Sequence, residues 1–479
     1  MATQERTDAA DLAATKASQR ALTIGLCAIV VAIAFETIAV ATAMPVAARD
    51  LDGLKYYAWA FSAFLIGMLF ATVLTGRLSD RTGPAKPLLV GLVIFLAGLI
   101  IAGSAPYMAQ LVAGRLVQGL GSGAMNVAIY VCVAVAFSRR QRPKMFTYIS
   151  TAWVLPSFVG PPVSAWLTQH LSWHWVFFAV IPLVIFGGAM AFPSLLRMMR
   201  VHRPTDADET KPAPMWAAGL LAVAAAMLQL AGQRLDWLAV GLAVGGVAGL
   251  LVALPPLMPP GFLRFRPGLP QVVLTRGLLA GAFFGAEAFV PLMLVEQRSV
   301  PLLEAGAVLT VGAIGWTVGS WLQSRPWLPI RRDRLITLGC ISVAIGVAMV
   351  GLIAFVPVLS YFLVAVAWIF SGLGMGLATS SGSLAVMSLS AVAEQGRNAS
   401  SLNVADALGS GIFVGIAGSI FAALSSSGNL ALTFGLLQLS MAVVGVLAVL
   451  TSRRIGVVRN EFAQHASANL TQHQDGDEH

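Results

Sequence analysis

Four ionisable residues lie deep inside long apolar stretches of this chain, where a charge is costly. They are Glu36, Arg115, Glu287 and Asp406. On insertion scales a charged side chain at the centre of a bilayer costs about 2.5–3.5 kcal/mol, and such residues mark proton relays, ion pathways and substrate contacts. These four residues therefore predict binding of a proton or a cation, or pairing with other charged groups.

Glu36 and Arg115 are the first candidates for such a pair. Glu36 lies about 15 residues into the first apolar stretch, near the middle of a bilayer. A carboxyl group at that depth takes up a proton more readily than in water, which suits it to bind and release one during a cycle. Arg115 keeps its charge at any working pH and needs an anion, a carbonyl or water beside it. By depth, Glu36 is its expected partner; a permanent structural tether is the alternative for both.

Glu287 and Asp406 have different surroundings in the sequence. Glu287 ends the small-residue run 281–287, and Pro291 follows one turn later. A glycine-rich helix that proline breaks and that carries a carboxylate suggests a gating helix, with Glu287 binding a proton or a cation. Asp406 lies nearer the cytoplasmic end of its stretch. There we expect it to pair with a nearby loop arginine or to act as a helix-start charge.

The composition indicates what kind of elements must carry these residues. The chain has 479 residues, of which 57% are hydrophobic and 11% charged, against about a quarter charged in a soluble domain. Apolar stretches of about 18 residues or more cross a bilayer as helices. The chain is therefore expected to be an all-α polytopic membrane protein with fourteen spans, near 21–46, 56–76, 88–104, 108–137, 145–168, 174–196, 215–232, 237–257, 270–295, 303–322, 334–356, 360–387, 401–424 and 429–451.

These spans group as six, two and six. The predicted parts are a cytoplasmic tail (1–20), a six-helix bundle (21–196), a linker with two extra spans (197–269), a second six-helix bundle (270–451) and another cytoplasmic tail (452–479). A faint internal repeat supports two related halves, since a glycine and basic residues recur after the second span of each half. Such repeats are common in transporters, which bind substrate between the halves near the midplane.

The basic residues predict the orientation of the spans. With the N-terminus inside, 25 of the 30 Lys and Arg residues fall on the cytoplasmic side, as short cytoplasmic loops require. Both termini are then cytoplasmic. This distribution explains the net charge of +9 without a nucleic-acid partner.

Cysteine and histidine offer no metal site. Cys27, Cys132 and Cys340 have no ligand spacing and are expected to be apolar packing residues, and all six histidines lie in loops, linkers or tails. We therefore expect no metal, and no catalytic histidine.

Two further motifs concern conformation. A polar loop is expected at residues 76–86, between the second and third spans, as a hinge at the membrane surface; it contains Gly76, Asp80, Arg81 and Gly83. In the fifth span, Gly160 and Pro161 permit close approach of another helix and a kink suited to rocking motion, although a merely bent packing helix is the alternative.

These motifs together resemble the major facilitator superfamily over nearly the whole chain. The loop containing Gly76 and Asp80 is similar to motif A, with Pro84 and Ala85 in place of a basic pair. Other matches are Arg115 and Gln118 to motif B, which is associated with proton coupling, Gly160-Pro161 to the centre of the antiporter motif C, and Glu36 with Pro45 to motif D. The fourteen spans and Trp173-His174-Trp175 resemble the fourteen-helix drug:proton antiporter branch.

The resemblance implies a major facilitator fold and a proton-driven exporter of amphipathic or lipophilic small molecules, working by alternating access. Glu36, Arg115, Gln118 and Glu287 would couple protons or face the substrate. Gly76, Asp80, Arg81, Gly83, Gly160, Pro161 and Asp406 would control conformation, with Asp80 closing the cytoplasmic side as a latch. The other expectations are no cofactor besides the proton gradient, no enzyme activity, a monomer, and a cell (plasma) membrane location.

Two alternatives differ in substrate or class. Export of an endogenous lipid or metabolite is the nearer one. A membrane-embedded transferase would need clustered Asp, Glu or His at one membrane face, and a sensor would need a soluble signalling domain; the sequence has neither.

Overall fold

The computed structural model is helical throughout the part of the chain that it describes. It describes residues 2–138, 141–201, 214–232, 234, 236–325, 327–328, 330–356, 358–391, 394–425 and 428–458, with the backbone alone at 2–17, 80, 143 and 201. These residues form sixteen α-helices and two short 3-10 helices. The chain divides into two compact units, Met1–Ala222 and Val223–His479.

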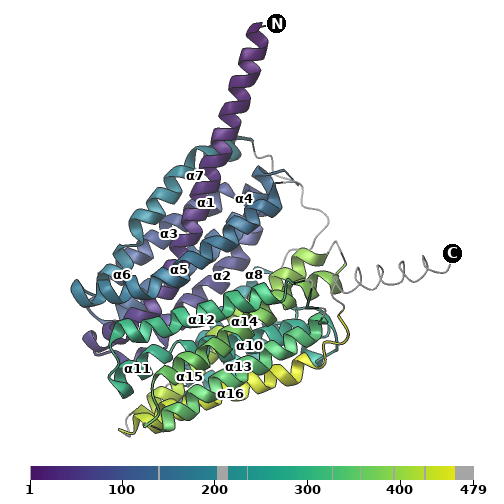
Figure 1. Cartoon of the computed structure of the whole chain (residues 1–479). Coiled ribbons are helices and arrows are strands. Elements are labelled where there is room, and N and C mark those ends of the chain that lie inside the picture. The colour runs from purple at the N-terminus through teal and green to yellow at the C-terminus, as the bar shows by residue number, and fades with distance from the viewer. Residues whose placement is uncertain are drawn as a thin grey trace, which may run out of the picture. The chain divides into compact units, whose positions relative to one another are not determined.

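The first unit contains α1 to α7 and the start of α8 (Figure 1). Their bounds are α1 Ala2–Asp50, α2 Trp59–Thr82, α3 Ala85–Gly103, α4 Met108–Ala136, α5 Arg142–His170, α6 His174–Phe178, α7 Ile181–Val201 and α8 Met215–Ala231, with a 3-10 turn at Leu54–Tyr56. The second unit contains α9 Trp237–Ala253, a 3-10 turn at Phe262–Arg264, α10 Leu269–Glu287, α11 Val290–Arg298, α12 Leu302–Leu322, α13 Arg332–Phe355, α14 Phe362–Leu389, α15 Gln395–Leu424 and α16 Leu430–Ser452.

Most of these helices are long and apolar enough to cross a membrane. Eleven helical segments of the described residues meet that criterion, with α6 joined to α7 and α10 joined to α11. Two shorter apolar helices, α8 and α9, lie where the two extra spans were expected. The remaining expected span is α5, whose 29 residues include three internal prolines and several polar groups that dilute its hydropathy. Together these are the fourteen predicted segments; their grouping as six, two and six stays a prediction.

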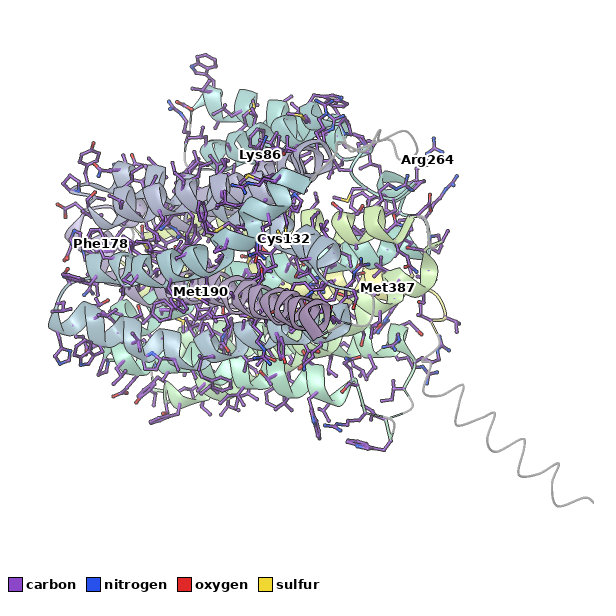
Figure 2. The ribbon with its side chains drawn as sticks, turned by 90° about the horizontal axis from the view of Figure 1, so that it is seen from above. Lys86, Cys132, Phe178, Met190, Arg264 and Met387 are labelled. Atoms are coloured by element: carbon purple, nitrogen blue, oxygen red, sulfur yellow. The ribbon has the colours of Figure 1, made fainter. Side chains whose placement is uncertain are left out.

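Both units contain large apolar side chains that face outward, as lipid-facing helices require. Examples are Val93, Val240 and Val443, which are 66%, 66% and 60% exposed. The cysteines instead pack inside, as predicted. Cys132 is buried (Figure 2), Cys340 is buried and Cys27 is half-buried, and all three are free thiols.

The same pattern of helix packing occurs in both units. In the first, α4 packs against α2 and α3, α1 packs against α5 and α7, and α3 touches α7. In the second, α14 packs against α12 and α13, α10 packs against α15 and α16, and α13 touches α16. The internal repeat that the loops only suggested is therefore present in the packing.

Glycines fix the register of this repeat. Among the glycines whose Cβ would collide with a backbone carbonyl of the facing helix are two matching pairs: Gly119 with Phe64 and Gly123 with Met68, and Gly372 with Gly312 and Gly376 with Trp316. Equivalent positions in α2 and α12 differ by 248 in residue number, as Phe64 and Gly312 do. Equivalent positions in α4 and α14 differ by 253, as Gly119 and Gly372 do. The same offset places Trp368 of α14 at the position of Arg115 in α4.

Candidate functional site

The first unit holds Glu36 and Arg115 together in its interior. The Nη1 of Arg115 forms an ion pair with Oε1 of Glu36, and their side chains are 2% and 0% exposed. The pairing expected from depth is therefore confirmed. Arg115 also donates from Nε to the carbonyl of Ala60 at 2.8 Å and from Nη1 to Oε1 of Gln118 at 2.7 Å. Its guanidinium lies 4.5 Å from the ring centre of Phe64.

Close helix packing positions this arginine. α4 is held between α2 and α3 by glycines on both of its sides, so that the backbone of α2 comes within reach of the guanidinium. Gly98 of α3 faces the backbone and side chain of Gln118, where a Cβ would lie 2.5 Å from the Gln118 nitrogen. The Gln118 side chain that accepts from Arg115 is thereby fixed in place. Arg115 is thus positioned by the packing of α2, α3 and α4 as well as by its ion pair with Glu36.

Several buried polar atoms of the pair, of Gln118 and of the helices that carry them have no hydrogen-bond partner among the described residues. They include Oε2 of Glu36, Nε2 of Gln118, and the hydroxyls of Thr42 and Ser122. Buried polar groups are nearly always satisfied, so such exceptions mark strained or functional places. A proton added at Oε2 would convert that oxygen from an acceptor into a donor.

The equivalent place in the second unit is aromatic. Trp368 is fully buried and stacks on Phe283 of α10, with ring centres 5.0 Å apart and planes at 23°. Phe283 also meets Trp316 edge to face at 5.7 Å, and Phe284 lies 6.4 Å from Trp316. This cluster is not among the features predicted from the sequence. Its signal was available, since Trp316 and Trp368 lie inside spans and not at their ends, where tryptophan usually gathers.

Glu287 is the last residue of α10, one turn after this cluster. It is half-buried and makes no hydrogen bond or ion pair with the described residues. α11 begins at Val290 with Pro291 in its first turn, so the span is broken where the sequence predicted. Phe283 and Phe284 precede Glu287 by four and three residues and share its helix face. Glu287 is therefore on the same face of α10 as two aromatic residues.

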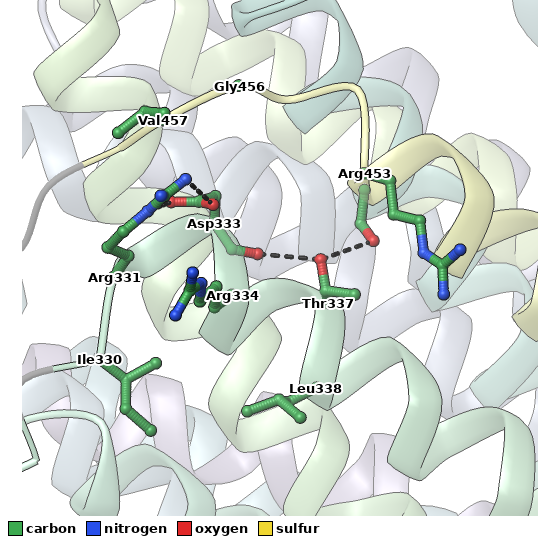
Figure 3. Close-up of a pocket in the computed structure, with 10 residues that line it drawn as sticks. Ile330, Arg331, Asp333, Arg334, Thr337, Leu338, Arg453, Gly456 and Val457 are labelled. Atoms are coloured by element: carbon green, nitrogen blue, oxygen red, sulfur yellow. Dashed lines mark hydrogen bonds and ion pairs between the residues drawn. The ribbon is translucent and has the colours of Figure 1, made fainter.

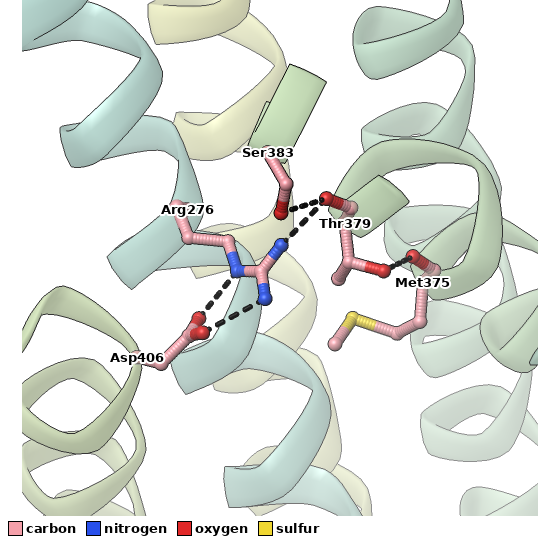
Figure 4. A network of polar contacts seen from close by, with 5 residues as sticks. All are labelled: Arg276, Met375, Thr379, Ser383 and Asp406. Carbon is pink, nitrogen blue, oxygen red and sulfur yellow. Dashed lines mark hydrogen bonds and ion pairs between the residues drawn. The ribbon is translucent and has the colours of Figure 1, made fainter. Parts of the chain in front are cut away.

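Asp406 is tied to Arg276 by a two-pronged ion pair (Figure 4). Nε and Nη2 of Arg276 donate to the two carboxylate oxygens at 2.6 and 2.8 Å, and Nη1 donates to the carbonyl of Thr379 at 2.9 Å. The side chains are 17% and 27% exposed. This network joins α10, α14 and α15. Asp406 is thus the partner of an arginine, although that arginine lies in a helix and not in a loop.

The polar loop expected at 76–86 is much shorter in the structure. α2 continues to Thr82, so Gly76, Asp80 and Arg81 lie in its last turns, and only Gly83 and Pro84 connect it to α3. No helix-breaking residue lies between Arg77 and Thr82, and Arg81 suits a helix C-terminus. Gly83 ends the helix with φ +75°, a conformation that favours glycine. The side chain of Asp80 lies outside the described residues.

Gly160 and Pro161 lie in the middle of α5, where it crosses α1. A Cβ on Gly160 would meet Ile38 at 3.5 Å, which is ordinary contact, so this glycine is not forced by space. One turn later, Ser164 donates to the carbonyl of Ala39 at 2.6 Å. No group of three metal-ligating side chains occurs in the described part of the chain.

Comparison with known proteins agrees with this architecture. The model of the Major Facilitator Superfamily matches residues 24–414. Multidrug resistance protein 3 of Bacillus subtilis (strain 168) is 27% identical over 328 residues, covering 64% of this chain but only 62% of that protein's length. The multidrug efflux pump SdrM of Staphylococcus aureus (strain N315) is 24% identical over 343 residues, covering 68% and 75%.

The fold also resembles a solved transporter. The crystal structure of a peptide transporter, POT, aligns with a TM-score of 0.63 over 90% of this chain and 95% of that one, at 15% identity. With the family match covering most of the sequence, the chain belongs to the Major Facilitator Superfamily.

Proposed function

We propose that this protein is a proton-coupled secondary transporter that exports amphipathic or lipophilic small molecules by alternating access, as a member of the fourteen-helix drug:proton antiporter branch. The observation that carries the proposal is the buried pair of Glu36 and Arg115, which has a carboxylate oxygen without a partner. The multidrug transporters among the relatives support the substrate class. The repeated helix packing supports a mechanism with two moving halves.

Proton binding would act on the pair through charge. A proton on Oε2 of Glu36 neutralises the carboxylate and removes its attraction to Arg115, which stays charged. The guanidinium keeps its bonds to Ala60 and Gln118, so it is not left without partners when Glu36 is neutral. The pair can thus exist with and without the proton, as coupling requires.

The second unit offers the features that a lipophilic cation needs. Phe284 and Trp316 are half-buried with ring centres 6.4 Å apart, and Glu287 lies one turn beyond Phe284 in α10. Aromatic faces and a carboxylate both attract organic cations, with about 0.5–2 kcal/mol for each cation–π contact. We assign Glu287 the role of substrate or cation binding.

Transport in proteoliposomes tests the proposal. The protein is reconstituted, the lumen is made acidic, and uptake of radiolabelled tetraphenylphosphonium is followed. The expected result is uptake that depends on the gradient and is lost in Glu36→Gln and strongly reduced in Glu287→Gln. The matched control is Glu304→Gln, which removes an exposed carboxylate that Tyr361 contacts. Unchanged gradient dependence in both test variants would contradict the coupling assignment.

Export of an endogenous lipid or metabolite is the second candidate. One relative is named for a biosynthesis cluster, the acurin A cluster transporter of Aspergillus aculeatus (strain ATCC 16872 / CBS 172.66 / WB 5094), which is 31% identical over 183 residues and matches 38% of this chain and 32% of that one. A compound panel that raises no growth difference between cells with and without the gene would favour this candidate over drug efflux.

A further inference from the structure

A pocket in the second unit lies where the chain leaves α16 and returns over the start of α13 (Figure 3). We call it the basic pocket; Arg331, Arg334, Thr337, Leu338, Arg453 and Val457 are among its lining residues. By the distribution of basic residues, this end of the spans is cytoplasmic. Its lining residues include neither Glu36 nor Arg115 nor any member of the aromatic cluster.

Backbone contacts hold the wall of the pocket in place. The segment after α16 is fixed to the first turn of α13, because Arg332 N–H donates to the carbonyl of Val458 and Val458 N–H donates to Asp333, both at 3.0 Å. Ser452 hydrogen-bonds Thr337 at 2.9 Å below this segment. The pocket is therefore part of the folded unit.

The charge of the pocket is unbalanced. Its one acidic residue, Asp333, is engaged by Arg331 through two hydrogen bonds of 3.0 and 2.7 Å. Arg334 and Arg453 are exposed and make no side-chain hydrogen bond or ion pair with described residues. Two guanidinium groups thus remain available, and a planar guanidinium binds phosphate oxygens two at a time.

Apolar side chains lie beside these charges. Leu338 and Val457 line the same pocket and are 46% and 65% exposed. α13 and α16 both cross the membrane by length and hydropathy, and the pocket is at their ends. Charge and apolar surface therefore meet at headgroup depth, and basic pockets there suit anionic headgroups.

We propose that the basic pocket binds a phosphate group, with Arg334 and Arg453 as its ligands and an anionic phospholipid headgroup as its source. Leu338 and Val457 would contact the adjoining glycerol and acyl chain. The same guanidinium chemistry would accept a free phosphate ion, which has no acyl chain to use the apolar wall. The experiment therefore includes both sources.

The test measures lipid binding to the full-length protein in detergent. Native mass spectrometry follows adducts with phosphatidylglycerol, phosphatidylcholine and inorganic phosphate for the wild type and Arg334→Gln/Arg453→Gln. At about 1 kcal/mol per arginine, loss of both should weaken phosphatidylglycerol binding roughly 30-fold. The matched control is Arg197→Gln/Arg200→Gln, which removes two exposed arginines at the end of α7 and should bind like the wild type.

Each outcome decides the proposal. Arginine-dependent binding of phosphatidylglycerol, with weak binding of phosphatidylcholine and phosphate, supports a lipid headgroup site. Equal arginine-dependent binding of inorganic phosphate supports the phosphate site but overturns the lipid source. Wild-type affinity in the double variant, or equal binding of phosphatidylcholine, overturns the proposal. Arg334→Lys/Arg453→Lys keeps both charges but not the planar fork. It should bind more tightly than the glutamine variant and less tightly than the wild type, which shows that a loss in the glutamine variant is not unfolding.

Discussion

Removing either Glu36 or Arg115 alone should destabilise the protein strongly, and removing both should cost less than the sum of the two single losses. Both side chains are almost fully buried, so a single substitution leaves one group without its counter-charge. Removing one partner of a buried pair costs about 3–5 kcal/mol, whereas removing both leaves no charge uncompensated. We expect Glu36→Gln and Arg115→Gln each to lower the free energy of unfolding by about 3 kcal/mol, and the double variant to lower it by clearly less than the sum.

The two single variants should respond differently to pH. In Arg115→Gln the remaining carboxyl can take up a proton and lose its charge, so the loss of stability should shrink as the pH falls. In Glu36→Gln the guanidinium keeps its proton at every working pH, so acid should not raise the free energy of unfolding of this variant. The direction of this difference follows from burial alone and does not depend on the transport mechanism.

Unfolding in mixed detergent micelles by rising dodecyl sulfate, followed by circular dichroism at an acidic and an alkaline pH, measures these free energies. The control cycle uses Arg234 and Asp236, whose side chains are 48% and 41% exposed; solvent screens an exposed pair, so its two losses should be nearly additive. Two results would refute the buried pair as a charge-balanced unit. One is additive losses of unfolding free energy at Glu36 and Arg115, and the other is a loss in Arg115→Gln that does not change with pH.

Three further predictions follow from packing and from the conformational residues. Gly119→Ala should destabilise the first unit by about 1–3 kcal/mol in the same unfolding assay, because its Cβ collides with α2, whereas Gly76→Ala, with nothing within 4 Å, should be neutral or stabilising by up to about 1 kcal/mol. Asp406→Asn should lower stability by about 1–3 kcal/mol, since Arg276 loses its charged partner in a partly buried site; an unchanged midpoint would contradict this. Asp80→Asn should shift the transporter toward inward-open states, measured by cysteine accessibility on the cytoplasmic side, and an unaltered balance would remove the latch proposal.

The sequence predicted the elements of the fold better than their contacts. Span number, the break before Pro291 and the burial of Glu36 and Arg115 follow from hydropathy, proline chemistry and the cost of intramembrane charge. The loop predicted at 76–86 is longer than the observed one, because charged residues between two spans favour a loop in sequence-based prediction. In the structure those residues continue α2, since nothing between Arg77 and Thr82 opposes a helix.

Other features of the site could be identified only from the structure. The partner of Asp406 could not be identified from sequence, because Arg276 lies 130 positions away and many arginines were candidates. The correspondence between Arg115 and Trp368 was hidden for another reason. The two residues share no chemistry, and only the matching glycine contacts of α4 and α14 reveal that they occupy the same position.

This correspondence bears on how a proton and a substrate could be coupled. The position that carries a buried charge pair in the first unit carries a stack of Phe283 and Trp368 in the second, which protonation does not alter. If Glu36 binds the proton and Glu287 the cation, the two do not compete for one carboxylate, and the coupling must pass through conformation. Glu36→Gln should then abolish the pH dependence of transport, while Glu287→Gln should chiefly raise the KM for the cation. Loss of pH dependence in both variants with unchanged KM would mean that one shared carboxylate step governs both ions.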